Sequence, residues 1–122
     1  MDENIFYGAF GVFFLIIMIA IAVVLIIAQW KIYEKAGKPG WAILIPIYNL
    51  IVLLEIVGKP LWWIFLFLIP FVNIIFGIWV TNLLSKSFGK DEAFTVGLIL
   101  LGIIFYPILG FGDAKYVGPA GK

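Results

Sequence analysis

Cysteine, histidine and arginine are all absent from this sequence of 122 residues. Without cysteine the chain forms no disulfide and offers no redox thiol, and without histidine it also lacks the commonest acid–base catalyst and zinc ligand. Arginine is the side chain that contacts phosphates and guanines in a bidentate manner, and the eight lysines form no basic run. We therefore expect no nucleic acid among the partners, and no metal and no cofactor.

Charge is scarce as well. Charged residues make up 12% of the chain and hydrophobic residues 65%, whereas a soluble domain carries about 25% charged and about 45–50% apolar residues. A chain this apolar could not cover its surface with polar groups in water, and a lipid bilayer removes that problem. The composition therefore predicts an integral membrane protein with the lipid bilayer as its first partner.

Four apolar stretches are expected to form helices. Residues 5–28, 61–84 and 93–112 carry no charge, and each stretch has the length of about 20 residues that a bilayer core of about 30 Å requires. The stretch 41–57 is shorter and contains Pro46, so it either spans or turns back within the membrane. The predicted fold is all-α, an integral membrane bundle of four hydrophobic helices, of which the second is short and broken by proline.

The chain is expected to form one transmembrane domain over residues 1–112, followed by a short polar tail over residues 113–122 that is exposed and disordered. The acidic start, with Asp2 and Glu3, favours a retained first helix over a cleaved signal peptide. Gly-Lys-Pro at 37–39 and again at 58–60 predicts two tight links between helices. Asp91 is expected to cap the last helix.

Two similar segments place a polar side chain inside the apolar stretches. Pro46 and Asn49 in the first segment correspond to Pro70 and Asn73 in the second. Proline frees a backbone carbonyl in a helix, and an asparagine three residues later can satisfy a freed backbone group, so we expect a kink at each segment. Glu55 is the one acid with an apolar run on both sides. Glu55, Asn49 and Asn73 are thus the candidate polar or ion site.

Each of these residues also has a purely structural interpretation. Glu55 precedes the Gly-Lys-Pro link at 58–60 and so can lie at the level of the lipid headgroups, near Lys59. The two asparagines can serve only to stabilise the kinks. Residue type and spacing leave both interpretations open.

The third apolar stretch carries small and weakly polar residues at a spacing of four. The central members are Gly77, Thr81 and Ser85. Such a stripe lets membrane helices approach closely and form hydrogen bonds across the contact. It is a candidate packing face within the chain, or a face that binds another membrane protein or a second copy in a homo-oligomer.

Lysine placement gives two topologies. If all four stretches span the membrane, five lysines lie on one side and three on the other. If the second stretch turns back, six lysines lie on one side, and only Lys86 and Lys90 lie on the other with the acidic N-terminus. The second arrangement is slightly favoured.

No catalytic residue is expected. The sequence Ser85-Lys86-Ser87 contains a nucleophile and a base, but neighbouring residues on a helix point to different sides and Lys86 cannot easily activate either serine. The prediction is therefore that the protein is not an enzyme.

The order of motifs resembles a known family. The segments 30–41, 45–49, 60–63, 69–73 and 87–90 are similar to those of small uncharacterised bacterial integral membrane proteins, over residues 30–112. A similar segment is fused ahead of the catalytic domain in some Bacteroidetes-type type I signal peptidases. The resemblance implies a multi-pass protein of the bacterial cytoplasmic (inner) membrane, near protein export or envelope biogenesis, and no proteolytic residue of those enzymes is present here.

Two functional hypotheses follow. The leading one is a non-enzymatic interaction or accessory module of the cell envelope that binds another membrane protein or itself. The alternative is a small oligomeric transporter or channel that uses Glu55 and the two Pro-x-x-Asn kinks.

Overall fold

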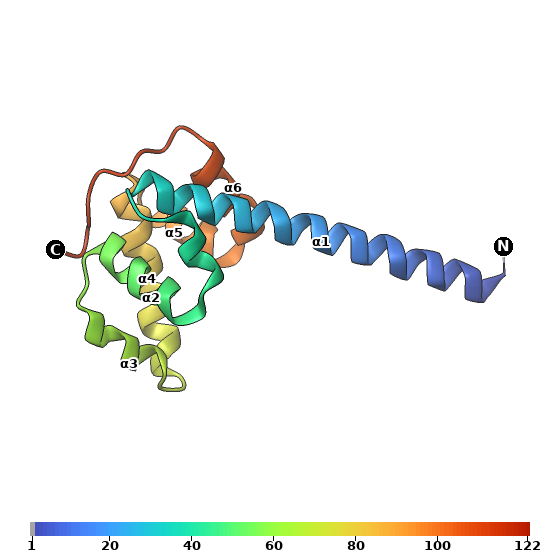
Figure 1. Ribbon diagram of the computed structural model, residues 1–122, viewed down its shortest axis with the longest axis horizontal. Helices are drawn as coiled ribbons and strands as arrows, with labels where there is room; N and C mark the ends of the chain where they lie inside the picture. The colour runs from blue at the N-terminus through green and yellow to red at the C-terminus, as the bar shows by residue number, and fades with distance from the viewer. Residues whose placement is uncertain (1) are drawn as a thin grey trace.

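The computed structural model describes residues 2–122, which form helices joined by turns and contain no strand. The first helix, α1 (Glu3–Lys35), begins at Asp2, whose side chain accepts a hydrogen bond from the backbone N–H of Asn4. Residues 3–20 of α1, which we call the stalk, are exposed along their whole length and project from a body made by the rest of the chain (Figure 1). The all-α class is confirmed. Within the described residues, α1 is the one helix long and apolar enough to cross a membrane.

The body consists of three hairpins, each made of a descending and a returning arm. In the first hairpin the arms are η1 (Gly40–Leu44) and α2 (Pro46–Val57). In the second hairpin, η2 (Leu61–Trp63) and α3 (Ile64–Phe67) together form the first arm and α4 (Val72–Ser87) forms the second. In the third hairpin the arms are α5 (Glu92–Leu100) and α6 (Gly102–Phe111). Aromatic contacts join the two arms of each hairpin, between Trp41 and Tyr48, Trp63 and Phe76, and Phe94 and Phe105.

The expected four helices differ from the structure in the third and fourth stretches, because each is broken in its middle. The third turns at Pro70 and Phe71, where Phe71 has a φ of 66° and the N–H of Val72 donates to the Pro70 carbonyl at 2.8 Å. The fourth turns at Leu101, where the ring of Phe105 packs against Gly97 so closely that a Cβ on Gly97 would lie 2.6 Å from it. Tertiary packing therefore breaks a helix that contains no proline at that point.

The tail, residues 113–122, lies across the ends of two hairpins. The backbone N–H groups of Val117 and Gly121 donate to the carbonyls of Ser87 and Val57, each at 2.7 Å, and the Tyr116 hydroxyl donates to the Ile56 carbonyl at 2.6 Å. These are the last carbonyls of α4 and α2, which have no partner inside their own helices. Burial raises the pKa of the Tyr116 hydroxyl, so it remains a donor at neutral pH.

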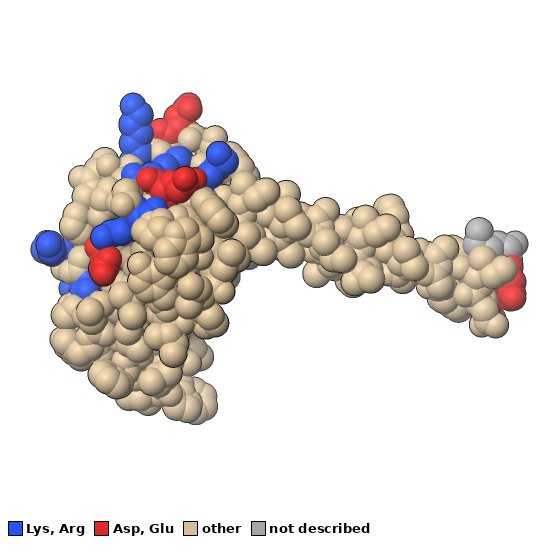
Figure 2. Space-filling model, viewed as in Figure 1, with Lys and Arg blue, Asp and Glu red and all other residues tan. Residues whose placement is uncertain are grey.

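Both ends of every hairpin lie on the same side of the body. The Lys35 ammonium donates to the carbonyls of Leu109 and Gly112 at 2.7 and 3.0 Å, which joins the end of α1 to the end of α6. The tail joins the end of α2 to the end of α4. Lys86 and Lys90 therefore lie on the same side as the other six lysines, whereas both expected topologies divided the lysines between two sides. Figure 2 shows the charged side chains gathered on this side of the body, with the acidic N-terminus at the far tip of the stalk.

Candidate functional site

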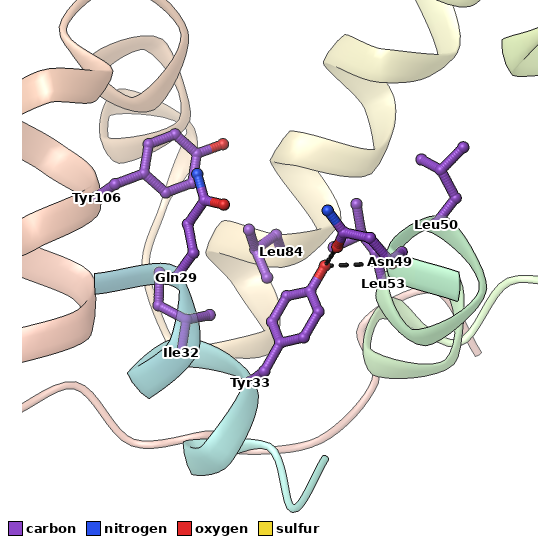
Figure 3. A pocket seen from close by; sticks show the side chains of 8 residues that line it. All are labelled: Gln29, Ile32, Tyr33, Asn49, Leu50, Leu53, Leu84 and Tyr106. Atoms are coloured by element: carbon purple, nitrogen blue, oxygen red, sulfur yellow. Dashed lines mark hydrogen bonds between the residues drawn. The ribbon is translucent and has the colours of Figure 1, made fainter. Parts of the chain in front are cut away.

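A polar cavity lies inside the body, where α1, α2, α4 and α6 meet. It has a volume of about 150 Å³. Its apolar wall is made by Ile32, Leu50, Leu53 and Leu84, and its polar groups are Gln29, Tyr33, Asn49 and Tyr106. Figure 3 shows these amide and hydroxyl groups pointing toward the space between the helices.

Tyr33 and Asn49 form the hydrogen-bonded part of this cavity. The Tyr33 hydroxyl donates to the side-chain oxygen of Asn49 and lies 3.3 Å from its backbone oxygen. Asn49 is in the first turn of α2, after Pro46, so the Pro-x-x-Asn spacing directs its side chain toward α1. The asparagine was expected to satisfy a backbone group near the kink, and its partner is instead a side chain 16 residues away.

Replacing Asn49 with leucine is expected to destabilise the body by about 0.5–1.5 kcal/mol, because the hydroxyl of the buried Tyr33 loses its side-chain acceptor and keeps only the backbone oxygen of residue 49 at 3.3 Å. Unfolding of the detergent-solubilised protein measures this loss. The double variant Asn49→Leu with Tyr33→Phe should lose less than the sum of the two single variants, because both changes remove the same hydrogen bond. Additive losses would show that the two side chains do not act together.

Glu55 lies at the charged side of the body and not in the polar cavity. Its carboxylate is 2.9 Å from the Lys38 ammonium, and both side chains are partly exposed. The two residues line a shallow pocket with Lys59 and Lys122. An exposed ion pair of this kind contributes little to stability. The partner of Glu55 is Lys38 and not the expected neighbour Lys59.

The three candidate polar residues are therefore not brought together. Asn49 lines the inner cavity and Glu55 lines the outer pocket. Asn73 lies half-buried in the first turn of α4, at the end opposite the tail. This arrangement gives no single ion site made of all three side chains.

The small-residue face of α4 is largely occupied within the chain. Ser85 is fully buried, and its hydroxyl donates to the Asp91 carbonyl at 2.9 Å. The Thr81 hydroxyl donates to the Gly77 carbonyl at 2.8 Å in its own helix. A Cβ on Gly77 would lie 4.0 Å from Phe67, so this glycine faces α3.

Several polar contacts in the structure were not predicted from the sequence. Gln29, Tyr33 and Tyr106 line the cavity, and Thr95 donates to the side-chain oxygen of Asn82 at 2.9 Å between α5 and α4. The available signal was the type of residue, because each is a polar side chain in or beside an apolar helix. At the charged side, Lys86 lies 2.8 Å from Glu92 and holds the pKa of that carboxyl below its usual value through a hydrogen bond.

The described residues contain no group of three or more acidic side chains that could hold a metal ion. The inner cavity holds amides and tyrosine hydroxyls, while the carboxylates and the lysines lie outside it. The cavity places no pair of acidic and basic groups around a common point.

Comparison with known proteins gives one finding. The family model described as "Family of unknown function (DUF5684)" matches residues 41–119. The matched part contains the three hairpins and most of the tail, and it leaves out α1. No curated protein and no solved structure matches this chain.

Proposed function

Because the chain belongs to DUF5684, a family of unknown function, we propose a function from its own geometry: a non-enzymatic integral membrane protein that binds another membrane protein along the stalk. In this proposal α1 crosses the bacterial cytoplasmic membrane and the body lies on one side of the bilayer centre. The context of protein export or envelope biogenesis comes from the resemblance to small bacterial membrane proteins and to the segment fused to signal peptidases.

The uncovered stalk is the observation that carries this proposal. Residues 3–20 are exposed along their whole length, including their apolar side chains. A bare apolar helix of this length is stable in hydrocarbon, where its backbone hydrogen bonds are internal. The body would then lie toward the end of α1 that carries Lys31 and Lys35.

Two glycines favour a protein over lipid as the neighbour of the stalk. Gly8 and Gly11 have no atom within 4 Å of a Cβ built on them, so they leave a gap between bulky side chains. Glycine in a helix costs about 1 kcal/mol relative to alanine, and nothing within the chain offsets this cost. A second helix could approach closely at this gap, as small residues allow in membrane helix pairs.

A photo-crosslinking scan along residues 5–20 in native membranes tests this proposal. We expect adducts with one protein that recur every three or four residues on the face of Gly8 and Gly11, because a partner helix contacts one face only. Gly8→Val should abolish these adducts without unfolding the body. Lipid adducts of equal yield at every position would contradict the proposal, and Phe65, exposed on α3, serves as the lipid-facing control.

The transporter alternative receives less support from this geometry. It required Glu55 and the two asparagines to act as one site, and Glu55 instead pairs with Lys38 in a separate pocket. The inner cavity contains amides and hydroxyls without a carboxylate, which also favours a binding role over acid–base chemistry.

A further inference from the structure

We propose that all three hairpins enter the membrane from the charged side and end within one leaflet. The protein would then occupy more of this leaflet than of the other, a shape that we call the wedge, and would bind preferentially to curved membrane. The favoured bilayer is convex on the charged side. This inference rests on the proposed function in one respect, namely that α1 spans the bilayer.

The depth of the third hairpin follows from its contacts with α1. At one end, Lys35 binds the Leu109 carbonyl; at the other, Ile103 lines a shallow pocket with Ala20 and Ile21. The apolar run of α1 ends at Ala28, before Gln29, and Ala28 is eight residues from Ala20, so the turn lies about 12 Å below that level. Half of a bilayer core is roughly 15 Å. The third hairpin therefore turns near the middle of the membrane.

The helices of the body are too short to cross the membrane. The arms α2, α4, α5 and α6 contain 12, 16, 9 and 10 residues, which correspond to about 18, 24, 14 and 15 Å. None of them reaches the roughly 30 Å of a bilayer core. Because both ends of each hairpin lie on the charged side, no hairpin needs to cross.

The turns of the hairpins are apolar and uncovered. Phe71, at the second turn, is 83% exposed, and Leu100, at the third, is 74% exposed; Leu44 and Ile47 are exposed beside the first. The positive φ of Phe71 strains a bulky residue, and contacts within the chain do not compensate because its side chain is bare. Burial of this side chain in hydrocarbon would compensate for the strain.

Part of the backbone at these turns is paired within the chain. The N–H of Val72 donates to Pro70, that of Asn73 to Ile69, and that of Leu101 to Gly97. Pro46 and Pro70 have no N–H to satisfy. Non-helical backbone is tolerated at membrane depth only when such groups are paired or buried.

The wedge shape follows from the unequal occupation of the two leaflets. One leaflet would hold α1 and the arms of three hairpins, and the other would hold the stalk alone (Figure 1). A membrane that is convex on the charged side has more area in the leaflet that holds the hairpins. Insertion there should therefore require less displacement of lipid than in a flat membrane.

Single cysteines test the topology, because the native chain has none. Cysteines at Asp2, Lys38, Lys59, Lys90 and Lys115 are labelled with an impermeant thiol reagent in sealed vesicles. We expect the four lysine positions to label from one side and Asp2 from the other. Lys59 and Lys90 on opposite sides would overturn the hairpin arrangement, whereas Asp2 and Lys38 on the same side would overturn the spanning helix of the proposed function.

Membrane tubes pulled from giant vesicles test the curvature preference. The full-length protein, labelled with a dye, is expected to be enriched in the tube relative to a lipid dye when its charged side faces outward. The same protein inserted with its charged side inward should be depleted from the tube, which provides the matched control. Equal enrichment ratios in the two orientations would overturn the wedge.

Discussion

Replacing Leu100 with lysine is expected to lower the stability of the membrane-inserted protein by about 2.5–3.5 kcal/mol, the cost of a lysine at the centre of a membrane helix on insertion scales. Leu100 is the last residue of α5, and its side chain contacts little else in the chain. In water the same change would have almost no effect, because an exposed leucine would become an exposed lysine. Any large effect therefore has to come from lipid around the third turn.

Val117 offers the matched control for this variant. It is 70% exposed, close to the 74% of Leu100, but it lies in the tail on the charged side. Val117→Lys should leave stability within about 0.5 kcal/mol of the native value. Unfolding in bilayers, or the fraction of chains that insert correctly, measures both variants. Equal effects of the two lysines would argue against a membrane-embedded turn.

Gly110→Val is expected to separate α6 from α1, at a cost of about 1–3 kcal/mol or more. A Cβ on Gly110 would lie 2.4 Å from the carbonyl oxygen of Ala28 and 2.9 Å from its Cα. These atoms belong to the backbone of α1, so no side-chain rotation can make room. The whole of α6 must shift, and the two hydrogen bonds from the Lys35 ammonium to the end of α6 are then lost.

Thermal unfolding in detergent gives the size of this effect, and cysteines placed at Lys31 and Phe111 and joined by a short bifunctional thiol reagent report the contact itself, because the Lys31 ammonium lies over the Phe111 ring. The yield of that crosslink should fall in Gly110→Val. The control is Gly8→Val, the same change in the same helix type with open space around it. If Gly110→Val and Gly8→Val have the same unfolding temperature, α6 does not pack on α1 as described.

The features that the sequence predicted correctly depend on neighbouring residues only. The links at 37–39 and 58–60 end their helices as expected, with Gly37 at a φ of 77° and Gly58 at 83°. The backbone N–H groups of Lys38 and Lys59 then donate to the carbonyls five residues earlier, which completes the usual termination of a helix by glycine. Asp91 caps α5 by accepting a hydrogen bond from Phe94 at 3.1 Å. Each of these structures is determined within one turn of the chain.

The features that were not predicted depend on contacts between different helices. The break at Leu101 involves packing of Phe105 on Gly97, and the polar cavity depends on a contact between Tyr33 and Asn49. Asn49 was recognised as a polar site, but nothing near it indicated which helix it would face. The tail was expected to be disordered because its composition is polar, and composition does not show that two helix ends need hydrogen-bond donors.

The hydrogen bonds of the tail also impose an order on the assembly of the chain. The donors at Tyr116, Val117 and Gly121 follow every helix in the sequence, while their acceptors lie at the ends of α2 and α4. During synthesis, therefore, α2 and α4 are made before the residues that join their ends exist. The hydrogen bonds that link the first two hairpins through the tail can form only after residues 116–121 have emerged.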